Sequence, residues 1–471
     1  VTTGHQLNLF TGPLYFLYKI ISAINLAKEL KQHFPKHDFV PVYWMATEDH
    51  DFEEICFFKH KGKKLKWDKE VQGAVGRIST SGLEKVYERF EGDLGKGRQA
   101  EKLRQLFKQA YLEHDTLTEA TRYLANALFA EHGLLILDGD SQALKRLFIP
   151  YVREELLRQT SFKKVTETNT SLSRHYDVQV NPREINLFYL DENLRERIIF
   201  EEGLYKINNT DKVYSEEAIL QELDSNPEKF SPNVLMRPLY QEIILPNLSY
   251  IGGGGEIAYW MQLKDYFKTV EVPFPILLLR HSVLLISAKQ RAKMSALGIS
   301  EKEIFLEQQE LIRNKVKEIS DLEIDFRPQR KQLEAMFEGL KSLSDRTDKS
   351  FTGAVLAQEK KQLNGLDKLE KRLLKAQKRK YHEIVGRITS LQDALFPRKS
   401  LQERQMNFAD FYEIHGDALI DNLVGHLEPL KLEFDLITLE FISSRKFAKP
   451  FGRPVSGIHY CTVPHLGGVS R

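Results

Sequence analysis

The chain has 471 residues, of which 42% are hydrophobic and 28% charged, a balance typical of a folded globular protein with two or three domains. Its 68 basic side chains nearly match its 66 acidic ones, so the net charge of +2 gives no electrostatic case for binding nucleic acid or a membrane surface. No apolar run is long enough to cross a bilayer, and the two cysteines, Cys56 and Cys461, stand far apart in no metal-like spacing. These features predict a cytoplasmic protein in a reducing compartment, with neither a nucleic-acid nor a membrane partner.

The first 290 residues alternate short apolar segments with helical ones, as α/β proteins do. The strands expected for a central sheet are continuous apolar runs at residues 1–3, 39–44, 134–137, 248–251 and 275–279. Runs of this kind are buried on both faces, as in a parallel sheet covered by helices on each side. The predicted fold class is therefore α/β, with a doubly wound parallel sheet.

Two long stretches interrupt the predicted sheet. Residues 52–130 begin with a hairpin and continue as helices, and residues 160–245 contain a polar β-meander. We interpret both as insertions that divide the core into residues 1–51, 131–159 and 246–299. We expect them to rise over the carboxyl edge of the sheet and to shape a site there.

Beyond about residue 300 the composition changes, because glycine becomes scarce and Lys, Glu, Gln and Leu dominate as far as residue 395. Apolar residues recur there at spacings of three and four, typical of heptad seams on long helices. The two seams are Leu366, Leu369, Leu373 and Ala376, then Ile384, Ile388, Leu391 and Leu395. They predict an α-helical coiled coil over residues 300–396, with a turn between antiparallel helices near 347–351. A helical segment that packs on the core (397–442) and an irregular tail (443–471) follow.

A first polar cluster follows the first predicted strand. Gly4-His5-Gln6 stands at the strand end, and Thr11 and Gly12 precede the first helix. The carboxyl edge of a parallel sheet is where α/β proteins place their ligands. Glycine lets backbone approach a ligand closely, while His5, Gln6 and the helix N-terminus favour an anionic oxygen. A tight turn with a solvated histidine would explain the same residues, but their place at the sheet edge favours a binding site.

A second polar cluster, Glu48-Asp49-His50-Asp51, follows the second predicted strand. A helix cap would account for Asp49 or Asp51 and for the glutamates that come next. It leaves Glu48 and His50 unexplained. Because adjacent carboxylates and an imidazole shift one another's pKa, such a group can supply a general base near neutral pH. The cluster therefore predicts a site, with the individual roles open.

A glycine run, residues 252–255, joins the fourth predicted strand to a helix that we expect to begin near Ile257. Consecutive glycines at a helix N-terminus can cradle a phosphate or a carboxylate, and a flexible turn is an equal alternative. The run matches neither G-x-G-x-x-G nor a P-loop. The site segments contain no His-x-x-x-His or Cys-x-x-Cys pair and no G-x-S-x-G elbow, so neither a metal nor a serine hydrolase is favoured.

Taken together, these motifs resemble the bacillithiol biosynthesis cysteine-adding enzyme family. The resemblance rests on Gly4-His5-Gln6 with residues 9–15, on residues 41–44 leading into 48–54, and on residues 427–430. It implies a Rossmann-like core with connective insertions and a carboxyl-terminal coiled coil that forms a homodimer. It also implies a ligase that joins cysteine to glucosamine-malate through an amide bond, in the last step of bacillithiol biosynthesis.

The chemistry of this reaction suggests roles for the residues of the polar clusters. On this hypothesis Asp49 or His50 handles the proton as the catalytic group. The substrate-binding candidates are Gly4, His5, Gln6, Thr11, Gly12, Glu48, Asp51, Gly253, Gly254 and Glu256. Activation of a carboxylate points to ATP or ADP as the cofactor. Two alternatives stay open, namely another adenylate-forming enzyme of the class I synthetase type, and a non-catalytic scaffold whose coiled coil binds a partner.

Overall fold

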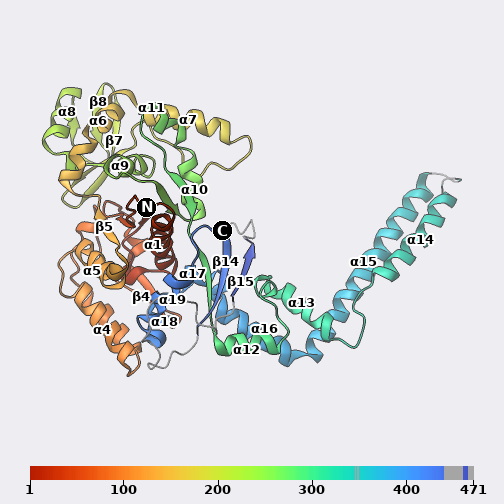
Figure 1. Cartoon of the computed structure of the whole chain (residues 1–471). Coiled ribbons are helices and arrows are strands. Elements are labelled where there is room, and N and C mark those ends of the chain that lie inside the picture. The colour runs from red at the N-terminus through yellow and green to blue at the C-terminus, as the bar shows by residue number, and fades with distance from the viewer. Residues whose placement is uncertain (345, 347–348, 440–459, 465–471) are drawn as a thin grey trace.

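A computed structural model describes residues 1–344, 346, 349–439 and 460–464 (Figure 1). Its central sheet has five parallel strands in the order β12-β11-β1-β2-β5. These strands are β1 (Thr2–His5), β2 (Val42–Met45), β5 (Leu135–Asp138), β11 (Ser249–Gly252) and β12 (Ile276–Leu279). Each overlaps one of the predicted strands.

Both faces of the sheet are buried, because alternate residues of one strand enter different cores. Tyr43 and Met45 belong to a core with α1 (Tyr15–His33), whereas Trp44 belongs to a second core on the opposite face. Since side chains alternate across a strand, this division shows that helices cover the sheet on each side. The predicted doubly wound α/β architecture is confirmed.

The first insertion lies between β2 and β5 and packs against the carboxyl-terminal part of the chain (Figure 1). The ring of Phe10, in η1 (Leu9–Thr11), lies 5.0–5.3 Å from four other phenylalanine rings, of which Phe408 comes from the carboxyl-terminal part. The elements of this insertion are α2 (Phe52–Ile55), β3 (Phe57–His60), β4 (Lys63–Lys66), η2 (Val75–Arg77), α3 (Glu84–Asp93), α4 (Arg98–Tyr111), α5 (Leu117–Phe129) and η3 (Ala130–His132).

The second insertion follows α6 (Gln142–Arg158) and forms the opposite end of the body in Figure 1. It contains the predicted β-meander as a sheet in the order β10-β6-β7-β8-β9. Its elements are α7 (Thr160–Leu172), β6 (Leu187–Asp191), β7 (Leu194–Glu201), β8 (Leu204–Ile207), β9 (Val213–Tyr214), α8 (Glu216–Ser225), η4 (Pro227–Lys229), β10 (Phe230–Pro232) and α9 (Arg237–Ile244). The chain re-enters the core at β11, followed by α10 (Gly254–Met261) and α11 (Lys264–Thr269).

The strand after β12 leaves the central sheet. β13 (Ser282–Ser287) pairs in parallel with β14 (Glu433–Leu439), and β14 pairs with the antiparallel β15 (Tyr460–Pro464). The central sheet thus ends before residue 299, the end that we predicted for the core. The predicted irregular tail, 443–471, contains β15, and its remaining residues lie outside the described part of the chain.

Helices complete the carboxyl-terminal part. The helical elements of this part, apart from α14 (Arg327–Ser344) and α15 (Lys349–Lys380), are α12 (Ala288–Ala296), η5 (Glu303–Phe305), α13 (Gln308–Ile319), α16 (His382–Leu395), η6 (Pro397–Lys399), α17 (Gln402–Gln405), α18 (Ala409–His415) and α19 (Ala418–His426). Ile388, Leu391 and Leu395 are buried against α12 and α13. The second predicted seam therefore packs inside a globular core of the carboxyl-terminal domain.

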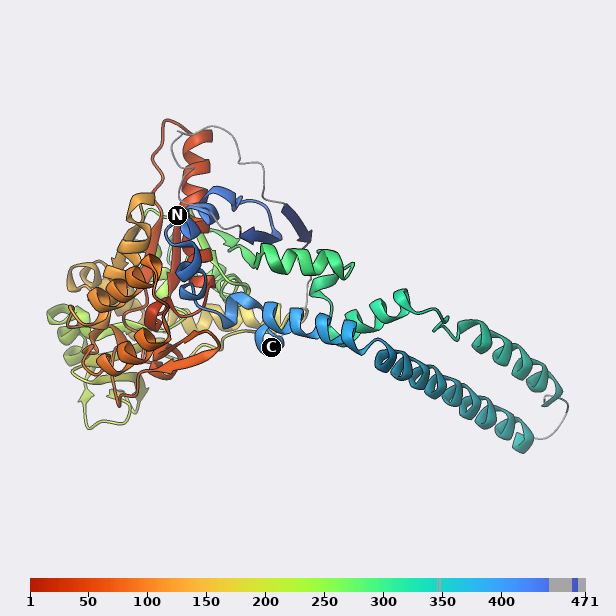
Figure 2. The ribbon, with the colours of Figure 1, turned by 90° about the horizontal axis from the view of Figure 1, so that it is seen from below.

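Two antiparallel helices, α14 (Arg327–Ser344) and α15 (Lys349–Lys380), project from the body as an arm (Figures 1 and 2). Of the predicted turn, residues 347 and 348 lie outside the described residues, and 349–351 already belong to α15. In the first predicted seam, Leu373 packs against the same core as Ile388, Leu391 and Leu395, whereas Leu369 is 54% exposed. No helix among the described residues is long and apolar enough to span a membrane.

Candidate functional site

A cavity of about 450 Å³ opens at the carboxyl ends of β1, β2, β11 and β12. The second insertion and α17 of the carboxyl-terminal part contribute to its walls. Eight of the predicted site residues line it: Gly4, His5, Gln6, Glu48, Asp49, Gly253, Gly254 and Glu256. The two polar clusters and the glycine run therefore meet in one place, as their positions at strand ends predicted.

The side chains of Tyr250 and Arg237 lie close to the backbone at Gly4. A Cβ atom on this residue would lie 3.0 Å from the hydroxyl oxygen of Tyr250 and 3.6 Å from the nearest guanidinium nitrogen of Arg237. The first distance is shorter than ordinary packing allows. Glycine at this position thus lets two polar side chains lie against the end of β1 inside the cavity.

His5 lies in the cavity wall and is only 7% exposed. Its ring contacts the rings of Tyr15 and Phe16, with centroid distances of 5.4 and 5.0 Å. Burial and the charges of Lys19 and Arg280 hold its pKa well below the ordinary value, so the imidazole is neutral at physiological pH. Its Nε2 atom has no hydrogen-bond partner among the described residues. Because its pKa is so low, His5 is a weak base, which suits a binding role better than proton abstraction.

Asp49 is held as a carboxylate. Burial alone would raise its pKa, but hydrogen bonds from His50 and Gln6 together with the charge of Arg195 hold the pKa well below the usual range. Gln6 Nε2 donates to Asp49 Oδ2 at 2.9 Å, and the backbone N–H of His50 donates to Oδ1 at 2.7 Å. A carboxylate so stabilised is a weak base, but it can bind a cation at any physiological pH.

Glu48, beside it, forms a buried ion pair that the sequence did not indicate. The partner is Lys145 on α6, whose side chain is 1% exposed. Burial raises the pKa of Glu48, and the charge of Lys145 opposes this rise. Lys145 Nζ also donates to the carbonyl oxygen of Phe230 on β10, at 2.7 Å. The pair joins the end of β2 to the second insertion.

The opposite wall is the start of α10, which begins at Gly254 and not near Ile257 as we predicted. Glu256 Oε2 accepts a hydrogen bond from the N–H of Gly253 at 2.9 Å and forms an ion pair with Lys19 at 2.5 Å. Its Oε1 accepts a hydrogen bond from the Tyr250 hydroxyl at 3.0 Å. Burial opposes ionisation of Glu256, but the charge of Lys19 and the hydrogen bonds from Lys19 and the N–H of Gly253 lower its pKa. Glu256 therefore fixes the wall in place.

Four predicted site residues do not line the cavity. The Asp51 carboxylate accepts a 3.3 Å hydrogen bond from the N–H of Glu54 and so caps α2, as the alternative interpretation of that cluster held. The side chain of His50 is 54% exposed and contacts Arg195 from outside, with 2.7 Å between Nδ1 and Nη1. Thr11 and Gly12 turn the chain with positive φ, and Gly12 accepts a hydrogen bond from Asn407 through its carbonyl oxygen. These positions give Thr11 and Gly12 a structural role.

Five cationic side chains in the lining were not predicted: Lys19, Arg195, Arg237, Arg280 and Arg404. Two of them had a signal in the sequence, since Lys19 interrupts an apolar helix and Arg280 directly follows the last strand of the sheet. The others had none, because only the tertiary fold brings their segments to the cavity. Against these five cations the lining has three carboxylates, so the site favours anionic ligands.

Comparison with known proteins places this architecture in a family. Residues 1–281 match the family model described as "Bacillithiol biosynthesis BshC, N-terminal Rossmann-like domain", and residues 283–439 match "Bacillithiol biosynthesis BshC, C-terminal coiled-coil domain". The chain belongs to the BshC family of bacillithiol biosynthesis. Family membership confirms the resemblance, the Rossmann-like fold class and the carboxyl-terminal coiled-coil domain, all of which were expected from the sequence.

Several family members match the chain over most of its length. A protein of Flavobacterium johnsoniae named "Putative cysteine ligase BshC" is 57% identical over 93% of this chain and 83% of its own length. Proteins with the same name from Flavobacterium psychrophilum and Christiangramia forsetii are 57% and 55% identical over 93% of this chain, covering 82% of each relative. BshC relatives are thus named as cysteine ligases.

Among solved structures, one titled as a putative arginyl-tRNA synthetase from Campylobacter jejuni matches 90% of this chain and 92% of its own. The match has 9% identity and a TM-score of 0.24, too low to support any argument about fold or function.

Proposed function

We propose that this protein is a ligase that joins cysteine to glucosamine-malate through an amide bond, the last step of bacillithiol biosynthesis. The observation that carries the proposal is the charge pattern of the cavity. Of its three carboxylates, Glu48 and Glu256 form ion pairs with lysines. Asp49 has no lysine partner; it is hydrogen-bonded to Gln6 and to the backbone N–H of His50, and its Oδ1 lies 3.5 Å from the imidazole of His50. Asp49 is thus suited to an ammonium group, and the arginines around it are suited to carboxylates. An amino acid and a malate conjugate carry these groups.

Formation of the amide bond determines which groups the cavity has to bind. The nitrogen of the sugar amine attacks the carboxyl carbon of cysteine and a C–N bond forms. One C–O bond of the carboxyl group breaks, and its oxygen would leave with a phosphate group from ATP. The proton of the amine passes to solvent water. A free carboxylate does not release oxygen readily, so the reaction needs activation, which we assign to ATP. The cationic lining and the glycine-rich start of α10 fit a nucleotide phosphate.

We assign roles to the lining residues accordingly. Asp49 receives an ammonium group, because its lowered pKa keeps it ionised. Gly4, His5 and Gln6 contact the substrate at the end of β1, and the wall at Gly253–Glu256 faces them. His50 acts from outside the cavity through Arg195.

We further propose that the protein acts in the cytoplasm as a homodimer formed through the arm. On α14 the apolar side chains of Met336, Leu340 and Leu343 recur at spacings of four and three and are 54%, 37% and 53% exposed. A stripe of this kind is typical of a helix that packs against a further helix. A second copy of the chain would cover it.

The test is conversion of cysteine and glucosamine-malate to a new thiol by the purified protein, with and without ATP. Asp49→Asn keeps the shape of the side chain but removes its charge, and we expect kcat/KM to fall about 10- to 150-fold, the equivalent of one charged hydrogen bond. Asp51→Asn is the matched control, because Asp51 lies two residues away and outside the cavity. The proposal fails if no thiol product forms, or if Asp49→Asn is as active as Asp51→Asn.

A further inference from the structure

One wall of the cavity holds a cationic side chain with an unused donor. Arg280 follows β12, lines the cavity and is 8% exposed. Its Nη1 donates to the carbonyl oxygen of His281 at 2.6 Å, and its Nη2 donates to Glu403 at 2.7 Å. The third guanidinium nitrogen, Nε, has no acceptor for its N–H in the part of the chain that the structure describes. A buried donor without a partner costs free energy, and a ligand that accepts from it would remove that cost.

The unused Nε–H lies beside the glycine-rich start of α10. A Cβ atom on Gly253 would lie 3.8 Å from Arg280 Nε, so the backbone there and the guanidinium are neighbours. The helix itself gives the first amides of α10 no acceptor, and both Gly254 and Gly255 line the cavity. Backbone N–H groups and an arginine donor that converge in this way suit an oxygen anion.

The orientation of Arg280 depends on the carboxyl-terminal domain. Glu403 on α17 is 1% exposed, and besides Arg280 it accepts from the N–H of Val283 at 3.2 Å. The preceding residue, Gln402, exchanges two hydrogen bonds of 2.9 Å with the backbone of Leu285 on β13. Glu403 is thus fixed against a rigid strand and in turn fixes the guanidinium.

The next residue of α17, Arg404, adds a second cation to the same wall. It lines the cavity and is exposed, and no ion-pair partner is found for it within the described ranges. A charged side chain without a protein partner is available to a ligand. One short helix of the carboxyl-terminal domain therefore both positions an arginine and supplies another.

We propose that an oxyanion of the substrates, a carboxylate or a phosphate, binds between the N-terminus of α10 and the Nε–H of Arg280, and that Glu403 positions this arginine for it. Arg404 contacts the same anion from the side. This inference deepens the proposed function, on which it rests, by naming the part of the cavity that takes the anion. It also makes the carboxyl-terminal domain a component of the ligand site.

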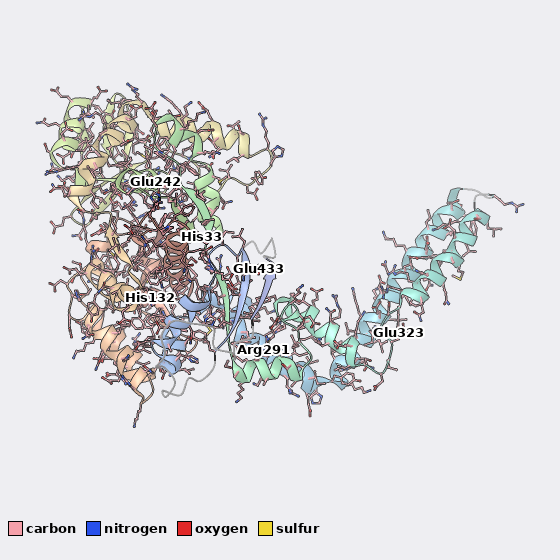
Figure 3. The ribbon with its side chains drawn as sticks, in the orientation of Figure 1. His33, His132, Glu242, Arg291, Glu323 and Glu433 are labelled. Atoms are coloured by element: carbon pink, nitrogen blue, oxygen red, sulfur yellow. The ribbon has the colours of Figure 1, made fainter. Side chains whose placement is uncertain are left out.

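The test measures binding to the full-length chain, so that it does not depend on catalysis. Pyrophosphate and L-malate are the two probes, since one represents a phosphate and the other a carboxylate source, and calorimetry gives their dissociation constants. We expect Glu403→Gln to weaken binding of one probe at least 10-fold. The matched control is Glu301→Gln, which removes the charge from an Arg–Glu pair with Arg291 on α12, away from the central sheet (Figure 3). It should bind both probes as the unaltered protein does.

Two further variants keep the test decisive. Arg280→Lys retains the charge but removes Nε–H, and it should lose the same probe at least 10-fold. Arg404→Met alters an exposed side chain, should leave the melting temperature unchanged and should weaken the probe several-fold. The inference is overturned if neither probe binds the unaltered protein saturably, or if Arg280→Lys and Arg404→Met bind as tightly as the control. If the variants lose the probe as expected but the unaltered protein forms no thiol, the proposed function is refuted and the anion site is not.

Discussion

Replacing Lys145 by Met should expose how much the fold depends on the buried pair with Glu48. The two side chains are 1% and 11% exposed, so the variant leaves a carboxylate inside the protein without its counter-ion. Removing one partner of a buried pair costs about 3–5 kcal/mol. With a sensitivity of about 2–4 °C per kcal/mol, the melting temperature at pH 7.5 should fall by roughly 6–20 °C.

The pH dependence of this loss follows from the direction of the pKa shift. Burial raises the pKa of Glu48 above its ordinary 4.5, and without Lys145 it rises further. A group whose pKa is raised by folding contributes its stability below the unfolded pKa and loses it as the pH rises through the folded pKa. The deficit of Lys145→Met should therefore be small near pH 4.5 and should grow toward neutral pH.

The assay is thermal unfolding followed by tryptophan fluorescence, because Trp44 and Trp260 are both buried in the core on one face of the central sheet. The double variant Glu48→Gln/Lys145→Met is the control, since it has no charge to bury and should recover most of the loss at every pH. An equally unstable double variant, or a deficit of Lys145→Met that does not change with pH, would refute the reasoning.

Three further predictions concern other parts of the chain. Gly4→Val places methyl groups against Tyr250, and kcat/KM should fall more than 10-fold at a cost of about 1–3 kcal/mol in stability; unchanged kinetics would contradict the close approach. Burial raises the pKa of Glu242 (Figure 3) to about 7, so Glu242→Gln should stabilise the fold by on the order of 1–2 kcal/mol at pH 8 and not near pH 4.5, as chemical denaturation would show. Leu340→Glu should yield monomers in sedimentation velocity, whereas Leu432→Glu, altering another exposed leucine, should leave a dimer; a dimeric Leu340→Glu would exclude this stripe as the interface.

The central sheet and the polar residues at its carboxyl edge could be predicted, because short stretches of sequence are enough to indicate both. Continuous apolar runs mark strands that are buried on both faces, and the residues that follow such strands lie at one edge. Asp49 and His50 show the limit of this argument. They are neighbours in the sequence, yet Asp49 lines the cavity and His50 lies outside it, because the chain turns there into α2.

The wall made by α17 could not be predicted, because its partners are remote in the sequence. Glu403 and Arg280 are 123 positions apart, and no periodicity or motif links them. The same holds for Lys145, whose partner Glu48 lies 97 positions away. The heptad spacing from Ile384 to Leu395 correctly marked an apolar helix face, but it could not show which elements cover that face, because those elements are remote in the sequence.

The contacts of residues 402–407 also bear on how the protein is made. Asn407 Nδ2 donates to the carbonyl oxygens of Phe10 and Gly12, at 2.7 and 2.6 Å, so this segment is bound to the loop between β1 and α1. During synthesis every strand of the central sheet leaves the ribosome more than a hundred residues before Arg404 does. A nascent chain can therefore fold its sheet early while its cavity still lacks a wall. If the proposed anion site is correct, the protein can bind the anion only after α17 has been synthesised, and we expect products truncated before α17 to be inactive.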